Sequence, residues 1–256
     1  MNTTLFTQYA AAMRQFNGDP QAPGLHIASE GRLSVYYAPT EWVNLAAKVV
    51  IVGITPGPTQ AVNALAEAKR QLLLGASVES TLMHAKKIGG FSGDLRTNLV
   101  AMLDRVGFHR WAQINSSADL FGARSDLIQT ASVLPYPVFV DRKPYSGSPS
   151  LLRSPLLRSL ALERFLPSAQ AIPNARLLAV GEVPFETLNW LAEHAHVDPA
   201  RILGRLPHPS GASGERIKYF LGRKPAAELS AKTNAVKLDD MRLHLEHALG
   251  SLVPGA

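Results

Sequence analysis

The apolar positions of this chain form short buried runs that alternate with amphipathic stretches. The first run, Val49–Val52, is β-branched and too short for a helix, which is typical of a strand buried on both faces. Gly53 ends it, and the tight turn Thr55–Pro58 precedes a helical pattern that begins at Thr59. The same reasoning predicts three further strands, at Leu127–Leu134, Ala175–Gly181 and Ile202–Leu206.

Helical spacing predicts helices on either side of these strands. The first helix lies within residues 1–25 and ends at Asn17–Pro20. Further helices are expected at about Leu95–Gly107, Leu156–Phe165, Phe185–Ala195, Arg216–Gly222 and Leu238–Leu249. Other stretches are expected to be irregular: Gly31–Trp42 as edge structure, His84–Gly90 as a basic connector, Pro135–Pro155 as a long loop, and Pro225–Asn234. Alternating strands and helices predict an α/β fold, three-layer α/β/α with a central four-stranded parallel sheet, in a single domain over residues 1–256.

The composition narrows the class of protein. With 256 residues, 46% hydrophobic and 18% charged, the chain can bury a large globular core. The absence of cysteine excludes disulfides, thiolate catalysis and cysteine-ligated metals, and the scattered histidines give no reason to expect a metal. There is no signal-peptide pattern and no apolar run near the ~20 residues that span a bilayer, so we expect a cytoplasmic protein without a membrane partner.

The charge balance favours an anionic partner. Lys and Arg number 26 against 20 Asp and Glu, a net charge of +6, and such a balance is typical of nucleic-acid binding. Between residues 201 and 224 one acid, Glu215, faces six basic residues: Arg201, Arg205, Arg216, Lys218, Arg223 and Lys224. Small residues beside them would let backbone amides approach a phosphate. The alternative is an ordinary solvated charged face.

Two polar turns follow apolar strands, Gly53–Pro58 and Pro207–Ser213. Parallel strands have their carboxyl ends on one edge of the sheet, so we expect both turns to face the same crevice. His208 stands between two prolines, which stiffen the backbone around it. Imidazole can serve as acid, base, hydrogen-bond donor or metal ligand, although a lone histidine is more often structural.

These turns resemble two motifs of the uracil-DNA glycosylase superfamily. Gly53–Pro58, G-I-T-P-G-P, is similar to motif A, G-x-[D/N/A]-P-[G/Y], and His208-Pro209-Ser210 is similar to motif B. Phe91-Ser92-Gly93 stands where several families have a Phe-x-Gly that stacks on the base. The resemblance covers about residues 45–225 and implies a uracil-DNA glycosylase-like domain on which the N-terminal and C-terminal helices pack.

The resemblance implies base flipping and hydrolysis of an N-glycosidic bond in DNA, with no cofactor. His208 would donate a hydrogen bond to the leaving base, stabilising charge that develops only in the transition state. The expected base-binding residues are Ile54, Phe91, Ser132 and Tyr145. The expected DNA-binding residues are Gly57, Pro58, Ser210, Gly211, Ser213, Arg216 and Lys218.

The chain departs from the uracil pattern in two places. Thr55 stands where many families have an Asp or Asn that acts on water, and a hydroxyl can orient water but not deprotonate it. Asp94, Asp126 and Asp141 are candidates for a relocated base, with Asp141 preferred. Thr130–Ser132 replaces the Asn that reads a pyrimidine edge, so we expect a pocket for a bulkier pyrimidine.

The leading hypothesis is therefore a monomeric DNA glycosylase acting on a modified pyrimidine. Pro135–Pro155, with Arg142, Lys143 and Tyr145, would line a sugar pocket for glucosylated hydroxymethylcytosine of phage DNA in antiphage defence. The alternatives are repair of uracil or deaminated bases and, from another class, a non-catalytic DNA-binding module, which Thr55 favours and His208 opposes. A nucleotide-binding protein is weaker because no G-x-G-x-x-G or P-loop follows a strand. Lyase activity is disfavoured because neither motif contains a lysine.

Overall fold

The computed structural model describes residues 4–253, which divide into two compact units. Unit 1 consists of residues 4–45, Gly53–Ser92 and Thr130–Ala171. Unit 2 consists of Ala46–Val52, Gly93–Gln129 and residues 172–253. The single domain expected from the sequence stays a prediction.

A four-stranded parallel sheet has the order β4-β3-β7-β8. Its strands are β3 (Val49–Gly53), β4 (Ile128–Ser132), β7 (Arg176–Val180) and β8 (Ile202–Leu206). In unit 2, β3 pairs in parallel with β7, and β7 pairs in parallel with β8. All five residues of β3 are buried, as the β-branched run predicts. The predicted α/β class and the four strands of the parallel sheet are confirmed.

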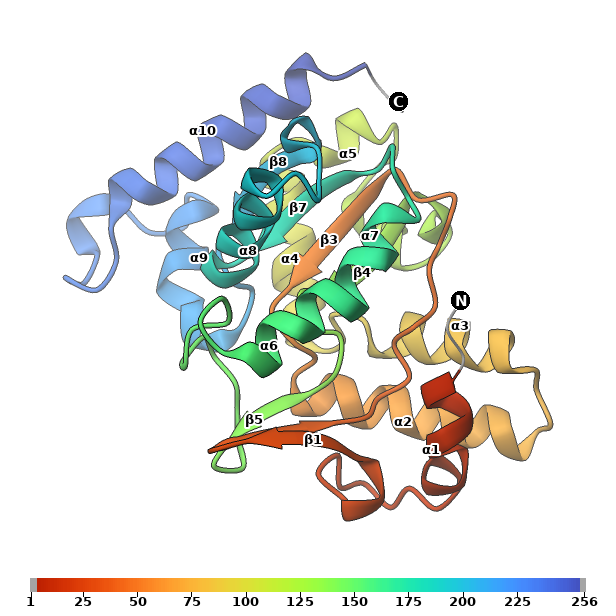
Figure 1. Cartoon of the computed structure of the whole chain (residues 1–256). Helices are drawn as coiled ribbons and strands as arrows, with labels where there is room; N and C mark the ends of the chain where they lie inside the picture. The colour runs from red at the N-terminus through yellow and green to blue at the C-terminus, as the bar shows by residue number, and fades with distance from the viewer. Residues whose placement is uncertain (1–3, 254–256) are drawn as a thin grey trace. The chain divides into compact units, whose positions relative to one another are not determined.

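The helices of unit 2 are α4 (Asp94–Arg105), α5 (Phe108–Trp111), α8 (Glu182–Glu193), α9 (Gly214–Phe220) and α10 (Ala235–Ser251). Helix α8 packs on β7 and β8, and α10 packs on β8, α9 and α5 (Figure 1). A Cβ atom at Gly204 of β8 would lie 2.8 Å from Cδ2 of His244, so only glycine allows α10 this close to the strand. The helices predicted for this part of the chain are confirmed.

Unit 1 contains a second sheet that the sequence did not reveal. Its antiparallel strands have the order β1-β2-β5-β6 and are β1 (His26–Glu30), β2 (Leu33–Tyr36), β5 (Val138–Val140) and β6 (Lys143–Pro144). Gly31–Trp42 and Pro135–Pro155 are therefore more ordered than predicted. Only β2 alternates, over four residues, which is too short a pattern to identify a strand. The β5–β6 turn uses Asp141 and Arg142 at φ 47° and 64°, where glycine or asparagine is the usual signal.

Four of the helices in unit 1 are α1 (Thr4–Arg14), α2 (Pro58–Leu73), α6 (Pro155–Leu160) and α7 (Leu166–Gln170), with a π-helical turn at Ala161–Phe165. Helix α1 packs on α2. The predicted helices after Thr59 and around Leu156–Phe165 are confirmed.

The prediction that His84–Gly90 is a connector is wrong. These residues belong mostly to α3 (Val78–Gly89), which buries Thr81, Leu82, Ala85 and Gly89 at helical spacing. A Cβ atom at Gly89 would lie 2.9 Å from Cβ of Ala64, so α3 packs closely on α2.

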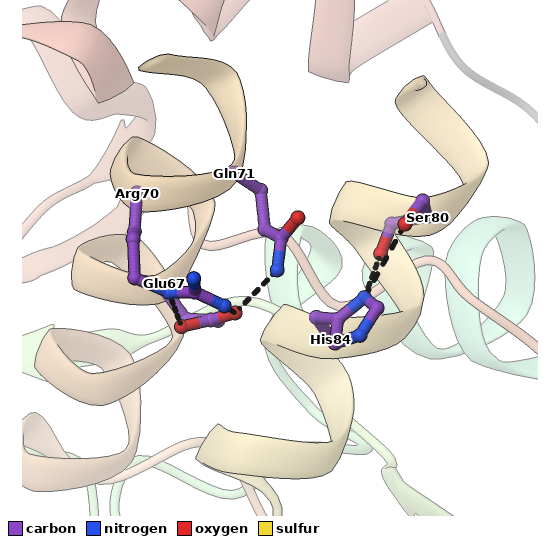
Figure 2. Close-up of polar contacts among 5 residues, drawn as sticks. All are labelled: Glu67, Arg70, Gln71, Ser80 and His84. Carbon is purple, nitrogen blue, oxygen red and sulfur yellow. Dashed lines mark hydrogen bonds and ion pairs between the residues drawn. The ribbon is translucent and has the colours of Figure 1, made fainter. Parts of the chain in front are cut away.

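Some polar side chains of this helix pair make hydrogen bonds within their own helix (Figure 2). On α2, the Glu67 carboxylate accepts hydrogen bonds from Arg70 at 2.7 and 2.9 Å and from Gln71 at 2.8 Å. On α3, Nδ1 of His84 lies 2.7 Å from the Ser80 carbonyl oxygen. The hydrogen bonds from Arg70 lower the pKa of Glu67 and keep that carboxylate charged.

Candidate functional site

A small pocket in unit 1 lies where β3 and β4 end, and we call it the strand-end pocket. The backbone N–H groups of Val133 and Leu134 donate to the carbonyl oxygens of Gly53 and Ile54, both at 2.9 Å, so the two chain segments run side by side. The pocket encloses about 30 Å³, room for about two water molecules. Residues of five segments line it, among them Thr40, Pro56, Gln60, Lys86, Phe91 and Thr130–Ser132.

Phe91 forms one wall of the strand-end pocket in a strained conformation. Its φ is 47°, a value that costs a non-glycine residue roughly 1–3 kcal/mol and persists only where the surroundings impose it. The Phe91 N–H donates to Oε1 of Gln60 at 3.0 Å, and Nδ2 of Asn63 donates to Oγ of Ser92 at 3.0 Å. A Cβ atom at Gly53 would lie 3.4 Å from Cζ of Phe91, so the ring rests against the end of β3.

The structure thus brings together Phe91 and Ser132, two of the four residues predicted to bind a base. It also adds Gln60 and Lys86, which sequence reasoning missed. The Lys86 ammonium donates to the Thr40 carbonyl oxygen at 2.9 Å. Burial lowers the pKa of Lys86 to about 8, with the Glu41 carboxyl acting in the opposite direction. Lys86 would have been placed here had its stretch been recognised as a helix, because Leu82, Ala85 and Gly89 mark the buried face.

Neither Ile54 nor Thr55 is among the described residues that line this pocket. The Thr55 hydroxyl donates its proton to the Tyr136 carbonyl oxygen at 2.8 Å and accepts from the Val138 N–H at 3.2 Å. Thr55 is 9% exposed, and its two hydrogen bonds link the turn after β3 to Tyr136 and to Val138 of β5. A role for Thr55 in orienting water stays a prediction, and its existing hydrogen bonds weigh against that role.

Asp141 and Tyr145 do not line the strand-end pocket either. Asp141 is exposed in the β5–β6 turn and forms an ion pair with Arg32, whose hydrogen bond lowers the pKa of Asp141. A carboxylate held in this way is a weaker base. Tyr145 is 3% exposed and donates to the Pro149 carbonyl oxygen at 2.6 Å, so its hydroxyl serves the chain locally. The hairpin that contains Arg142 and Lys143 therefore adds no wall to this pocket.

In unit 2, His208 follows β8 and Gly181 follows β7. The Gly181 N–H donates to the Leu206 carbonyl oxygen at 2.9 Å, and a Cβ atom at Gly181 would lie 3.5 Å from Cδ2 of His208. Gly181 has φ +98°, so glycine suits both the backbone and the close approach of the ring. Nδ2 of Asn98, on α4, donates to the Pro209 carbonyl oxygen at 2.8 Å and holds the turn in place.

The hydrogen bonds of His208 determine which ring nitrogen carries the proton. Nδ1 accepts from the Ser210 N–H at 3.3 Å and lies 3.0 Å from Oγ of Ser210. A backbone N–H can only donate, so Nδ1 is unprotonated and the proton is on Nε2. Burial lowers the pKa of His208 below its usual value of about 6.5, which keeps the ring neutral at pH 7. His208 therefore presents a neutral Nε2–H donor.

A cavity of about 300 Å³ lies beside this ring, and we call it the His208 pocket. Its lining includes Glu182 and three exposed cations, Arg216, Lys232 and Lys237. Glu182 forms ion pairs with Lys237 at 3.0 Å and Arg205 at 3.4 Å. Cations outnumber the acid, so this pocket suits an anion.

Half of the predicted basic cluster has a structural role instead. Arg201 is buried and donates to the carbonyl oxygens of Ala175 and Ile172 at 2.9 and 2.8 Å. Arg205 lies over the ring of Phe185 at 4.4 Å, and Lys224 forms an ion pair with Glu215 at 2.8 Å. These contacts orient the side chains within unit 2, which the count of charges could not show.

The remaining predicted DNA-binding residues lie in different settings. Lys218 is exposed but does not line the His208 pocket, because two residues along α9 turn the side chain about 200° away from Arg216. Ser210 precedes the 3₁₀ turn Gly211–Ser213, in which Gly211 is exposed and Ser213 is buried. In unit 1, Gly57 is the N-cap of α2 and Pro58 its first residue.

The described residues contain neither a candidate metal site nor a membrane-spanning helix. Within residues 4–253, no group of three or more His, Cys, Asp or Glu side chains is arranged to hold a metal ion. No helix in that same range is long and apolar enough to cross a bilayer.

The fold and these pockets define an α/β protein with a parallel sheet. It has a pocket walled by the strained Phe91 where β3 and β4 end, and a basic pocket around His208. No protein-family model matches the chain, and no solved structure matches it. The chain is 35% identical over 216 residues to the protein of Bacillus subtilis (strain 168) named "Uncharacterized protein YoxB". The matched residues cover 83% of this chain and 84% of YoxB. The chain belongs to the YoxB family.

Proposed function

We propose that this protein is a DNA glycosylase of the uracil-DNA glycosylase superfamily. The observation that supports the proposal best is the strained Phe91 in the strand-end pocket, directly against the end of β3. Strain of this kind gathers at ligand sites, where it holds a side chain ready for its partner. A flat aromatic wall with nearby hydroxyl and amide groups suits a nucleobase, which stacks on the ring and bonds along its edge.

The state of His208 supports the same proposal. Cleavage of a glycosidic bond leaves negative charge on the departing base, and a donor that meets this charge accelerates the reaction. His208 is neutral with its proton on Nε2, so it supplies a donor without first losing or gaining a proton. Donors of this kind contribute about 10²–10³ to the rate.

DNA is the proposed partner, and its backbone is the proposed ligand of the His208 pocket. Arg216, Lys232 and Lys237 provide positive charge there, and each phosphate contact releases condensed counterions. We keep Gly57, Pro58, Ser210 and Gly211 as proposed backbone contacts. Ser213 and Lys218 are less well supported because one is buried and the other lies on a different face of α9.

For the base, we propose a pyrimidine. There are two alternatives. One is a hypermodified cytosine of phage DNA, removed in antiphage defence, and the other is a deaminated base, removed in DNA repair. The small volume of the strand-end pocket and the absence of Arg142, Lys143 and Tyr145 from its described lining favour the smaller, deaminated base. Any base requires the pocket to widen beyond its room for about two water molecules, and a glucosylated base requires the most widening.

Base release from a panel of DNAs tests the proposal. The panel contains uracil, hypoxanthine, hydroxymethylcytosine and glucosylated hydroxymethylcytosine in one sequence context, and mass spectrometry identifies the products. Release of uracil alone supports repair, and release of the glucosylated base alone supports defence. No release from any DNA, with salt-sensitive binding intact, would contradict the glycosylase and favour the non-catalytic DNA-binding module.

A further inference from the structure

Lys86 is a cation built into a pocket whose other walls are largely apolar or backbone. It lies in the last turn of α3, half-buried, and its ammonium reaches across to the Thr40 carbonyl oxygen at 2.9 Å. An ammonium has three protons to donate, and that carbonyl accepts one of them. No aspartate or glutamate is among the described residues that line the strand-end pocket. The Glu41 carboxyl acts on Lys86 through its charge but lies outside this lining, so a ligand in the pocket can accept from the remaining donors.

The other polar groups of the strand-end pocket also favour a ligand with acceptors. Oε1 of Gln60 already accepts from the Phe91 N–H, which leaves the amide NH₂ of Gln60 as a donor. The hydroxyls of Thr130 and Ser132 can donate or accept. Lys86 only donates and Gln60 retains its amide NH₂ as a donor, so an edge with oxygen acceptors is recognised better than an edge with an amino group.

Placing a lysine at position 86 costs free energy of desolvation that folding by itself does not require. Burial disfavours a charged amine, as the lowered pKa of Lys86 indicates, and an apolar side chain would pack there without that cost. Desolvated titratable groups that line a pocket are typical of functional sites. In this low-dielectric setting, a hydrogen bond to the ammonium is also stronger than one on the surface.

We propose that Lys86 determines which base enters the strand-end pocket: its ammonium donates to a carbonyl or carboxylate oxygen on the base edge and selects such bases over those that present an amino group. This inference rests on the proposed function because it assigns the strand-end pocket to a nucleobase. It deepens that function by naming the substrate class, a pyrimidine with an acceptor or a negative charge on its inner edge. Lys86 acts here as a specificity-determining residue in place of a side-chain amide.

Two matched comparisons test the proposal with the full chain. Isothermal titration measures binding of the free bases uracil and cytosine, and of uracil-5-carboxylate against 5-hydroxymethyluracil. The wild-type protein should prefer the first of each pair by about tenfold to a hundredfold, the range of a charge-assisted hydrogen bond. Lys86→Met should lose most of this preference, and Lys86→Arg should retain part of it.

Lys87→Met is the matched control, because Lys87 is the next residue of α3, is exposed and lies over the Trp42 ring at 5.8 Å. It should leave both preferences unchanged. Equal preferences in wild type and Lys86→Met, or no binding of any free base by the wild type, would overturn the proposal. A merely structural Lys86 would weaken all four ligands equally, which would overturn it as well.

Base release from uracil-containing and cytosine-containing DNA is measured in parallel on the same proteins. If the wild type binds free bases selectively but releases none from DNA, the glycosylase is wrong and the role of Lys86 in base selection stands. If base is released equally by wild type and Lys86→Met without loss of selectivity, the glycosylase stands and the role of Lys86 is wrong. The two failures are therefore distinguishable.

Discussion

The strand-end pocket of unit 1 and the His208 pocket of unit 2 hold cations in opposite ways. The first encloses about 30 Å³ and contains one lysine, Lys86, whose pKa burial lowers to about 8. The second encloses about 300 Å³ and contains three exposed cations, of which Lys237 pairs with Glu182. The same type of charge is desolvated in one pocket and hydrated in the other.

This difference separates two kinds of recognition. A charge in a low-dielectric pocket interacts strongly over short distances and is screened little by salt, which suits the choice among similar bases. Exposed charges act over about a Debye length and weaken as salt rises, which suits a phosphate backbone of any sequence. We therefore expect changes in the strand-end pocket to alter which base is released, and changes in the His208 pocket cations to alter how tightly DNA binds.

The largest expected effect comes from His208→Ala. Loss of the Nε2–H donor should lower the rate of base release by about 10²–10³, or about 2.7–4 kcal/mol, while DNA affinity stays within about twofold. Single-turnover base release and fluorescence anisotropy on the same DNA measure the two quantities. His247→Ala, at an exposed position of α10, is the control. An unchanged rate in His208→Ala would remove this histidine from the chemistry.

Phe91→Ala should lower kcat/KM for base release by about tenfold to a hundredfold, because stacking of one base on an aromatic ring contributes about 1–3 kcal/mol. The decrease should be similar at low and high salt. Phe91→Gly is the matched variant, since it also removes the ring but relieves the φ of 47°. Both variants should lose the same activity, with the glycine variant melting at the higher temperature. Full activity in both would show that the ring does not contact the base.

Thr55→Val tests whether the turn after β3 contributes to chemistry or to the fold. The substitution leaves the buried Val138 N–H without its acceptor, so the free energy of unfolding should fall by about 1–3 kcal/mol. Base release per folded molecule should be unchanged, and Thr55→Ser should restore stability. Denaturant titration measures the first quantity. A large loss of rate at normal stability would instead support the predicted role of Thr55 in orienting water.

The smallest effects should come from single cations of the His208 pocket. Arg216→Gln, Lys232→Gln and Lys237→Gln should each reduce the slope of log affinity against log salt by about 1, with a modest loss of affinity at low salt. Anisotropy titrations over a series of KCl concentrations measure the slope. Lys218→Gln, on another face of α9, should leave it unchanged. An equal effect of Lys218 would mean that DNA lies along α9 rather than in the pocket.

The buried parts of the parallel sheet could be predicted from the amino-acid sequence. Val49–Val52 and the other apolar runs have no alternative to burial, because exposing them to water costs about 25 cal/mol per Å². Helical spacing was equally informative for α4, α8 and α10. Phe91 and Ser132, both predicted to bind a base, line the same pocket, and their role in binding stays a prediction.

Only the tertiary structure decided which polar side chains reach a pocket. Thr55 is bonded to Tyr136 and Val138, more than 80 residues away, and Arg201 to carbonyl oxygens 26 and 29 residues away, so neither role leaves a local pattern. Asp141 occupies a hairpin turn that lacks the usual glycine signal. Lys86 belongs to a helix whose buried face depends on contact with α2. Hydrophobic periodicity reports burial along the chain, whereas the partner of a polar group depends on which distant segments the folded chain brings together.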